Sequence, residues 1–159
     1  MYGIQITGLG ATGNTIKGNI IGLQKDGSTL VSGAAQSYGV ALQSSAASNK
    51  IGDIGAGEGN VISGNNNTGI LLETSSTGNS VIGNRIGTQA NGTSAVSLNP
   101  QIYGVSINGS PNNTIGGATP EARNIISANE QYGIFITPAG STGNSVKGNY
   151  IGPGSTLTS

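Results

Sequence analysis

The stretch STGNSVIGNRIG, from Ser76 to Gly87, decides the fold because the chain repeats it almost unchanged. Residues Ser141 to Gly152 read STGNSVKGNYIG, in which ten of the twelve positions are identical, and a third copy, ATGNTIKGNIIG, occupies 11–22. Successive copies start 65 residues apart. Self-similarity at a fixed period indicates a protein made of stacked copies of one structural unit.

Each 65-residue period divides into two shorter units, so the chain contains five copies of one unit of about 24 residues. Every copy opens with a glycine and a short apolar alternation (YGIQI, YGVAL, TGILL, YGVSI and YGIFI). Two asparagines follow in each copy, each with an aliphatic residue two positions later. The first and third copies carry about eleven extra residues before the next glycine, whereas the second and fourth carry six (IGAGEG and ATPEAR).

Each unit contains three short apolar pairs at i and i+2, separated by glycine and asparagine, and this pattern predicts strands rather than helices. A unit this short cannot bury its own apolar face, so the copies must stack, strand on equivalent strand. We therefore predict an all-β fold, a right-handed parallel β-helix (a solenoid) of about five coils with alternating loop insertions. The handedness follows the general rule for parallel crossovers. Residues 1–159 are expected to form a single domain and to be a segment of a longer solenoid.

Four columns of aliphatic residues are expected to point inward. They are Ile4, Val40, Ile70, Val105 and Ile134; Ile6, Leu42, Leu72, Ile107 and Ile136; Ile16, Ile51, Val81, Ile115 and Val146; and Ile21, Ile62, Ile86, Ile126 and Ile151. Two asparagine ladders are expected at the bends, because a short amide tolerates a left-handed conformation and stacked amides bond to one another. They comprise Asn14, Asn49, Asn79, Asn113 and Asn144, and Asn19, Asn60, Asn84, Asn124 and Asn149.

Composition narrows the possible functions. Six basic and six acidic residues cancel, and a neutral chain with 8% charged residues lacks the basic surface that nucleic acids or anionic membranes attract. No apolar run approaches the length of a membrane span, and the start MYGIQITG does not read as a signal peptide. The chain has no cysteine or histidine, which removes thiol chemistry and the commonest general base. We predict no cofactor, no metal site, no nucleic-acid partner and no membrane insertion.

Two motifs carry a resemblance to a known class. The pattern NTIGG..PEARNIIS.N at Asn113–Asn129 alternates with GN.IGT...G at Gly83–Gly92. This alternation resembles the right-handed β-helix repeats of large bacterial surface and secreted proteins, over essentially the whole chain. The resemblance implies a pectate-lyase-like superfold and an extracellular or cell-surface location, and it implies no particular activity. Members of that class often carry Asp after IGT, where this chain has Gln24 and Gln89.

The sharpest catalytic hypothesis for a β-helix is polysaccharide cleavage. Glycoside hydrolysis needs two facing carboxyl groups at a defined separation. The six acids lie in different loops: Asp26, Asp53, Glu58, Glu73, Glu121 and Glu130. Glu58 and Glu121 occupy similar insertions two coils apart, about 9.6 Å by the strand spacing, which is marginal for an inverting pair. We therefore predict no catalytic residues and no enzymatic activity.

Tyrosines precede four of the five opening glycines: Tyr2, Tyr38, Tyr103 and Tyr132. They are the predicted ligand-binding residues if sugar rings stack on them, as on other aromatic stripes. The alternative, which we favour, is a column of tyrosines that stack on one another and shield a sheet edge. Thr68 interrupts the row.

One outward-facing row is unusually apolar: Ile20, Val61, Arg85, Ile125 and Tyr150. Such a row is either a contact surface or lies under a loop. The long insertions carry Leu30, Val31, Val96 and Leu98, and we expect these residues to cover the row.

Two functions remain compatible with the sequence. The first is a non-catalytic scaffold, a structural β-solenoid segment of a bacterial extracellular or surface protein. Because the first strand begins at Tyr2 and the last coil ends in GPGSTLTS, neither end has an evident cap. This predicts end-to-end self-association into a fibre or filament, or packing against neighbouring coils of a parent protein. The second is a carbohydrate-binding or polysaccharide-degrading module with glycans as partners.

Overall fold

The computed structural model describes residues 1–31, 36–96, 100–137 and 139–152, and all regular structure in them is β-strand. The long strands are β1 (Tyr2–Thr7), β4 (Tyr38–Gln43), β7 (Thr68–Glu73), β10 (Tyr103–Asn108) and β13 (Tyr132–Thr137). A second set comprises β2 (Thr15–Ile16), β5 (Lys50–Ile51), β8 (Ser80–Val81), β11 (Thr114–Gly116) and β14 (Ser145–Lys147). A third comprises β3 (Ile20–Ile21), β6 (Val61–Ile62), β9 (Arg85–Ile86), β12 (Ile125–Ser127) and β15 (Tyr150–Gly152).

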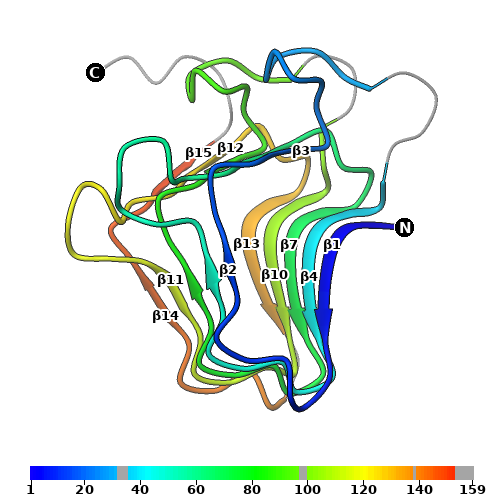
Figure 1. Cartoon of the computed structure of the whole chain (residues 1–159), viewed down its shortest axis with the longest axis vertical. Coiled ribbons are helices and arrows are strands. Elements are labelled where there is room, and N and C mark those ends of the chain that lie inside the picture. The colour runs from blue at the N-terminus through cyan, green and yellow to red at the C-terminus, as the bar shows by residue number, and fades with distance from the viewer. Residues whose placement is uncertain (32–35, 97–99, 138, 153–159) are drawn as a thin grey trace.

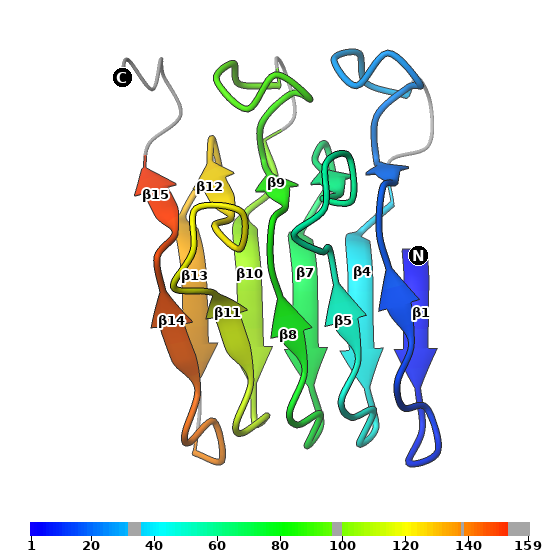
Figure 2. The same ribbon diagram turned by 60° about the vertical axis from the view of Figure 1, so that its left-hand side comes forward.

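The strands form three parallel five-stranded sheets, one for each position in the repeat. Their orders are β1-β4-β7-β10-β13, β2-β5-β8-β11-β14 and β3-β6-β9-β12-β15, so each coil adds one strand to every sheet. Figure 1 looks along the stack, and Figure 2 shows the five coils side by side, with the long strands forming one wall. The prediction of a five-coil parallel β-helix is confirmed.

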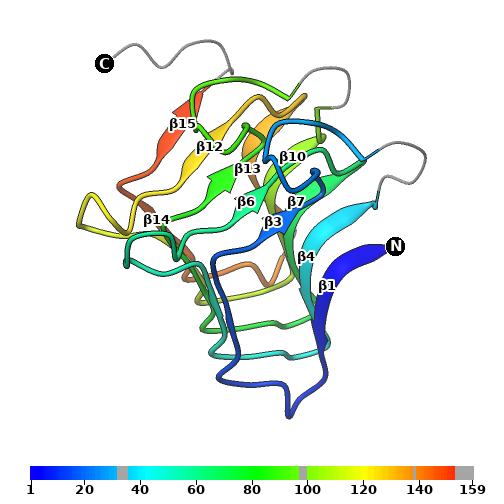
Figure 3. The same cartoon turned by 45° about the horizontal axis from the view of Figure 1, so that its top comes forward.

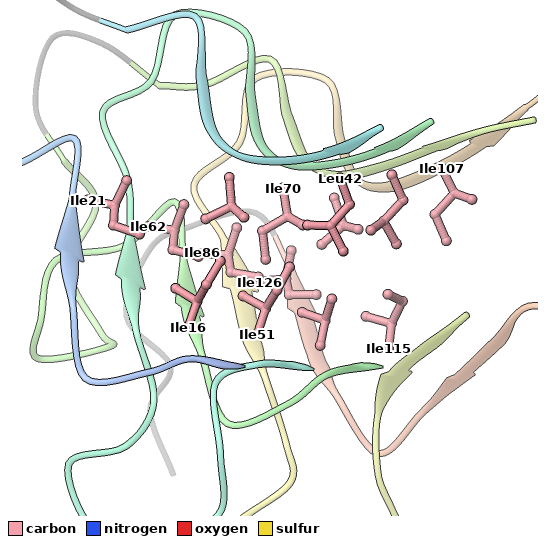
Figure 4. Packing of buried hydrophobic residues seen from close by; sticks show 14 of the residues in the cluster. Ile16, Ile21, Leu42, Ile51, Ile62, Ile70, Ile86, Ile107, Ile115 and Ile126 are labelled. Atoms are coloured by element: carbon pink, nitrogen blue, oxygen red, sulfur yellow. The ribbon is translucent and has the colours of Figure 1, made fainter. Parts of the chain in front are cut away.

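The core lies between the three sheets and consists of the predicted aliphatic columns. The registers Ile4↔Val40, Ile16↔Ile51 and Ile21↔Ile62 place equivalent residues of successive coils next to one another. In the middle coils these side chains are completely buried and pack as one cluster (Figure 4). The columns reach the surface at the last coil, where Val146 is 42% and Ile151 is 51% exposed.

The two long insertions follow β3 and β9 and rise on the same side of the stack (Figure 3). Leu30 and Val96 pack with Val61 and Leu23 in a second apolar cluster, which confirms the predicted cover over the middle of the outward row. The cover does not extend to the ends, because Ile20 is 40% and Tyr150 is 50% exposed. Val31 is also exposed, and Leu98 lies outside the described residues.

Both insertions close in the same way. The side-chain amide of Gln24 donates to the carbonyl of Leu30 at 3.1 Å, and that of Gln89 donates to the carbonyl of Ala95 at 3.0 Å. An amide can donate this bond and a carboxylate cannot. Gln24 and Gln89, which stand where the resembled repeats often carry Asp, therefore hold the two long insertions closed.

Candidate functional site

The first asparagine ladder follows one bend of the coil and is buried in the three middle coils. The backbone N–H and the side-chain amide of Asn49 both donate to Oδ1 of Asn79, at 2.9 and 3.1 Å. Asn79 makes the same two bonds to Oδ1 of Asn113, at 2.9 and 3.0 Å. The second amide hydrogen of Asn79 goes to the carbonyl of Ala46 at 3.1 Å. Each central asparagine therefore satisfies its own donors and those of the coil before it.

The second ladder repeats this geometry. Asn60 donates twice to Oδ1 of Asn84, at 3.0 and 2.9 Å, and Asn84 donates twice to Oδ1 of Asn124, at 2.9 and 3.0 Å. Asn60, Asn84 and Asn124 are at most 1% exposed. Unpaired amides at such depth would cost about 1–3 kcal/mol each. Both predicted ladders are confirmed.

The ladders have a direction that spacing alone did not reveal. In every pair the earlier coil donates and the later coil accepts through Oδ1. At the first coil, Oδ1 of Asn14 and Asn19 therefore accepts no hydrogen bond from the described residues. At the last coil, the backbone N–H groups of Asn144 and Asn149 find no acceptor among the described residues. The two ends of the stack present opposite hydrogen-bonding groups.

The four predicted tyrosines lie on the long-strand sheet in two groups rather than one column. The rings of Tyr2 and Tyr38 stack with centroids 5.2 Å apart, and those of Tyr103 and Tyr132 stack at 6.0 Å. Thr68, almost completely buried, separates the groups because it has no ring to continue the stack. Stacking favours the shielding interpretation, because each shared ring face is closed to a sugar. Their role in ligand binding stays a prediction.

Sequence reasoning missed two neighbours of this row. Phe135 lies 5.2 Å from Tyr103 and 5.1 Å from Tyr132, measured between ring centroids, and completes a three-ring cluster. Gln43 donates to Glu73 and reaches the hydroxyl of Tyr2 at 3.4 Å. The alternation along the strand places Phe135 on the outward face, so its position could have been predicted. The contacts of Gln43 depend on side-chain conformation and could not.

Two of the acids are held by local donors. The hydroxyl of Thr29 and the backbone N–H groups of Ser28 and Thr29 bind Asp26 and hold its pKa well below the ordinary value. The backbone N–H of Ile54, together with Lys50, lowers the pKa of Asp53. These carboxylates therefore serve as loop supports in their charged form.

Glu58 pairs with Lys17 of the preceding coil, with Nζ 2.5 Å from Oε1, and this hydrogen bond raises the pKa of Lys17. The contact directs the Glu58 carboxylate toward the first coil. The third coil lies between the two insertions, since a Cβ on Gly83 would approach the carbonyl oxygens of both Asp53 and Glu121. Glu121 itself makes no ion pair with the described residues. The structure thus gives no geometric support to a catalytic pair formed by Glu58 and Glu121.

The described residues offer neither a metal site nor a membrane-spanning helix. No group of three or more acidic side chains is placed to hold a metal ion. No helix of the described chain has the length and apolar character needed to cross a membrane.

The chain was also compared with known proteins. It matches no protein-family model, no curated protein and no solved structure. The assignment as a parallel β-solenoid therefore stands on the sheet topology and the ladders.

Proposed function

We propose that this protein is a non-catalytic structural element, a rigid β-solenoid segment that joins further coils at its two ends. The observation that carries the proposal is the polarity of the asparagine ladders, which leaves acceptors at the first coil and donors at the last. A second copy placed head to tail would let both ladders continue. Neighbouring coils of a longer parent protein would bond to the same ladder acceptors and donors.

The apolar columns support the same arrangement. Ile136, Val146 and Ile151 are 42%, 42% and 51% exposed on the last coil. On the first coil Ile4 and Ile6 are half-buried and pack against the core from one side only. Burying these residues between two stacked coils adds hydrophobic stabilisation to the continued sheets. A head-to-tail contact repeats without closing, so its product is a filament.

We expect the purified chain to associate in a concentration-dependent manner, observed by sedimentation velocity and electron microscopy. Val146→Lys should prevent association, because it puts a charge into the face that would be buried. Ile54→Lys is the matched control, because Ile54 is 56% exposed on a lateral insertion. A wild-type chain that remains monomeric at every concentration, or an unaffected Val146→Lys variant, would contradict self-association.

We expect no depolymerisation of pectin-like or other polysaccharides. Asp26, Asp53 and Glu58 are each bonded to a neighbouring residue rather than facing a second carboxyl group, as hydrolysis would require. Reducing-end and unsaturated-product assays check this expectation. A product signal that disappears in Glu58→Gln or Glu121→Gln would show that the chain is an enzyme.

An extracellular or cell-surface location fits this proposal. It rests on the resemblance of the repeats to those of bacterial surface and secreted proteins. A parallel solenoid held by internal ladders requires no disulfide for its stability, consistent with a chain that has no cysteine.

A further inference from the structure

A hollow of about 270 Å³ lies on the outer face of the sheet that contains β9, β12 and β15, and it borders the second asparagine ladder at Asn84. Its lining includes Arg85, Pro120, Glu121, Arg123, Ile125 and Tyr150. Arg85, Ile125 and Tyr150 lie on β9, β12 and β15. The six-residue insertion between β11 and β12 supplies Pro120, Glu121 and Arg123 (Figure 2). Three successive coils therefore build the hollow.

Arg85 is the charged member of an otherwise uncharged row. Its column neighbours are Val61 and Ile125, and an aliphatic side chain at this position would continue the row. Nε of Arg85 is buried and has no hydrogen-bond partner. The backbone of the long insertion lies close by, since a Cβ on Gly92 would come within 3.0 Å of this nitrogen. A buried guanidinium nitrogen without an acceptor weakens the fold, so its presence needs another explanation.

Arg123 is held at the same hollow by two contacts. Its Nε donates to the carbonyl of Gly148 at 2.8 Å, and its guanidinium carbon lies 4.2 Å from the centroid of the Tyr150 ring. Both contacts restrict the side chain, and a cation over a tyrosine face is a favourable arrangement. The described residues offer no acceptor to its terminal NH₂ groups, which remain available to a ligand.

The charges of the lining indicate the ligand. Two arginines and Glu121 give the hollow a net charge of +1 in a chain whose own net charge is zero. Arginine recognises carboxylates through paired N–H donors. Glu121 accepts hydrogen bonds from hydroxyl groups, and Pro120 and Ile125 offer apolar contact. The volume suits one small molecule rather than a polymer segment.

We propose that this hollow binds a small hydroxylated carboxylate, with its carboxylate on Arg85 and Arg123 and its hydroxyl groups near Glu121. The carboxylate would bind the terminal NH₂ groups of the two arginines, because Nε of Arg85 is enclosed beneath the long insertion. This binding role goes beyond the scaffold function and does not depend on end-to-end association.

Isothermal titration calorimetry with gluconate and glucuronate tests the ligand class, and glucose and inorganic phosphate serve as comparison ligands. We expect at least one of the two carboxylates to bind and glucose to show no binding. Preference for gluconate identifies an open-chain hydroxy acid, and preference for glucuronate a cyclic sugar acid. Equal binding of glucose, binding of phosphate as tight as that of the carboxylates, or no binding of either carboxylate overturns the proposal.

Variants then test the residues. Arg85→Met and Arg123→Lys should each weaken carboxylate binding roughly tenfold or more, because a charged hydrogen-bond pair is lost. Lys147→Met, which removes a cation from another sheet, should bind like the wild type. Arg85→Met should also keep or raise the melting temperature, because it removes an unpaired buried nitrogen. A lowered melting temperature would assign Arg85 to loop packing, and unchanged binding in both arginine variants would place the ligand elsewhere; either result overturns the assignment.

Discussion

Replacing Asn79 with alanine is expected to lower the free energy of unfolding by about 2–4 kcal/mol, because two donors lose their only acceptor. Those donors are the backbone N–H and one side-chain amide hydrogen of Asn49, both bonded to Oδ1 of Asn79. Asn49 is 2% exposed, so water cannot replace the lost acceptor. Chemical denaturation followed by circular dichroism measures the change.

The first coil supplies the matched control. Asn14→Ala removes one side-chain donor to Oδ1 of Asn49, which still accepts the backbone N–H of residue 14 at 2.9 Å. No buried donor loses its partner, so we expect a loss below about 1 kcal/mol. Equal losses at the two positions would show that the ladders do not hold the coils together.

Replacing Gly87 with alanine is expected to destabilise the protein by more than about 3 kcal/mol. Alanine is strained in the left-handed conformation at this position, and its methyl group would also collide with the backbone of the next coil. Gly87 has a φ of +88°, and a Cβ there would lie 2.1 Å from the carbonyl oxygen of Ser127 in the next coil. The two coils must separate locally to admit the methyl group, which disturbs the parallel ladder between β9 and β12.

Gly13→Ala separates the two effects. Gly13 has a φ of +70°, but a Cβ there would meet no atom within 4 Å. Only the cost of the left-handed conformation remains, about 1–2 kcal/mol. Thermal and chemical unfolding of both variants check the difference. If Gly13→Ala lowers the free energy of unfolding as much as Gly87→Ala does, the close approach of neighbouring coils is not the reason that position 87 requires glycine.

The coils and columns could be predicted because they depend on periodicity. A residue such as Ile51 or Val81 recurs at a fixed offset from an asparagine, and stacking equivalent positions places it in the core whatever the length of the intervening loops. The cover was predictable only in part, because Leu30 aligns with Ala95 in the repeat and Val96 aligns with the exposed Val31.

Features without periodicity could not be predicted. The direction of the asparagine ladder depends on amide orientation, and the spacing of Asn49 and Asn79 is compatible with either sense. Arg85 and Arg123 line one hollow because a short insertion in the fourth coil reaches the same place as β9 in the third. Their separation in the sequence occurs once, so no repeat signals it.

Hydrogen exchange of the asparagine side-chain amides, measured by nuclear magnetic resonance, tests the central claim most directly. The claim is that two directional ladders tie the five coils into one rod. We expect slow exchange for the amide hydrogens of Asn79 and Asn84 that bond to the next coil, and faster exchange for those of Asn14, which is exposed. Exchange at Asn79 and Asn84 as rapid as at Asn14 would contradict it.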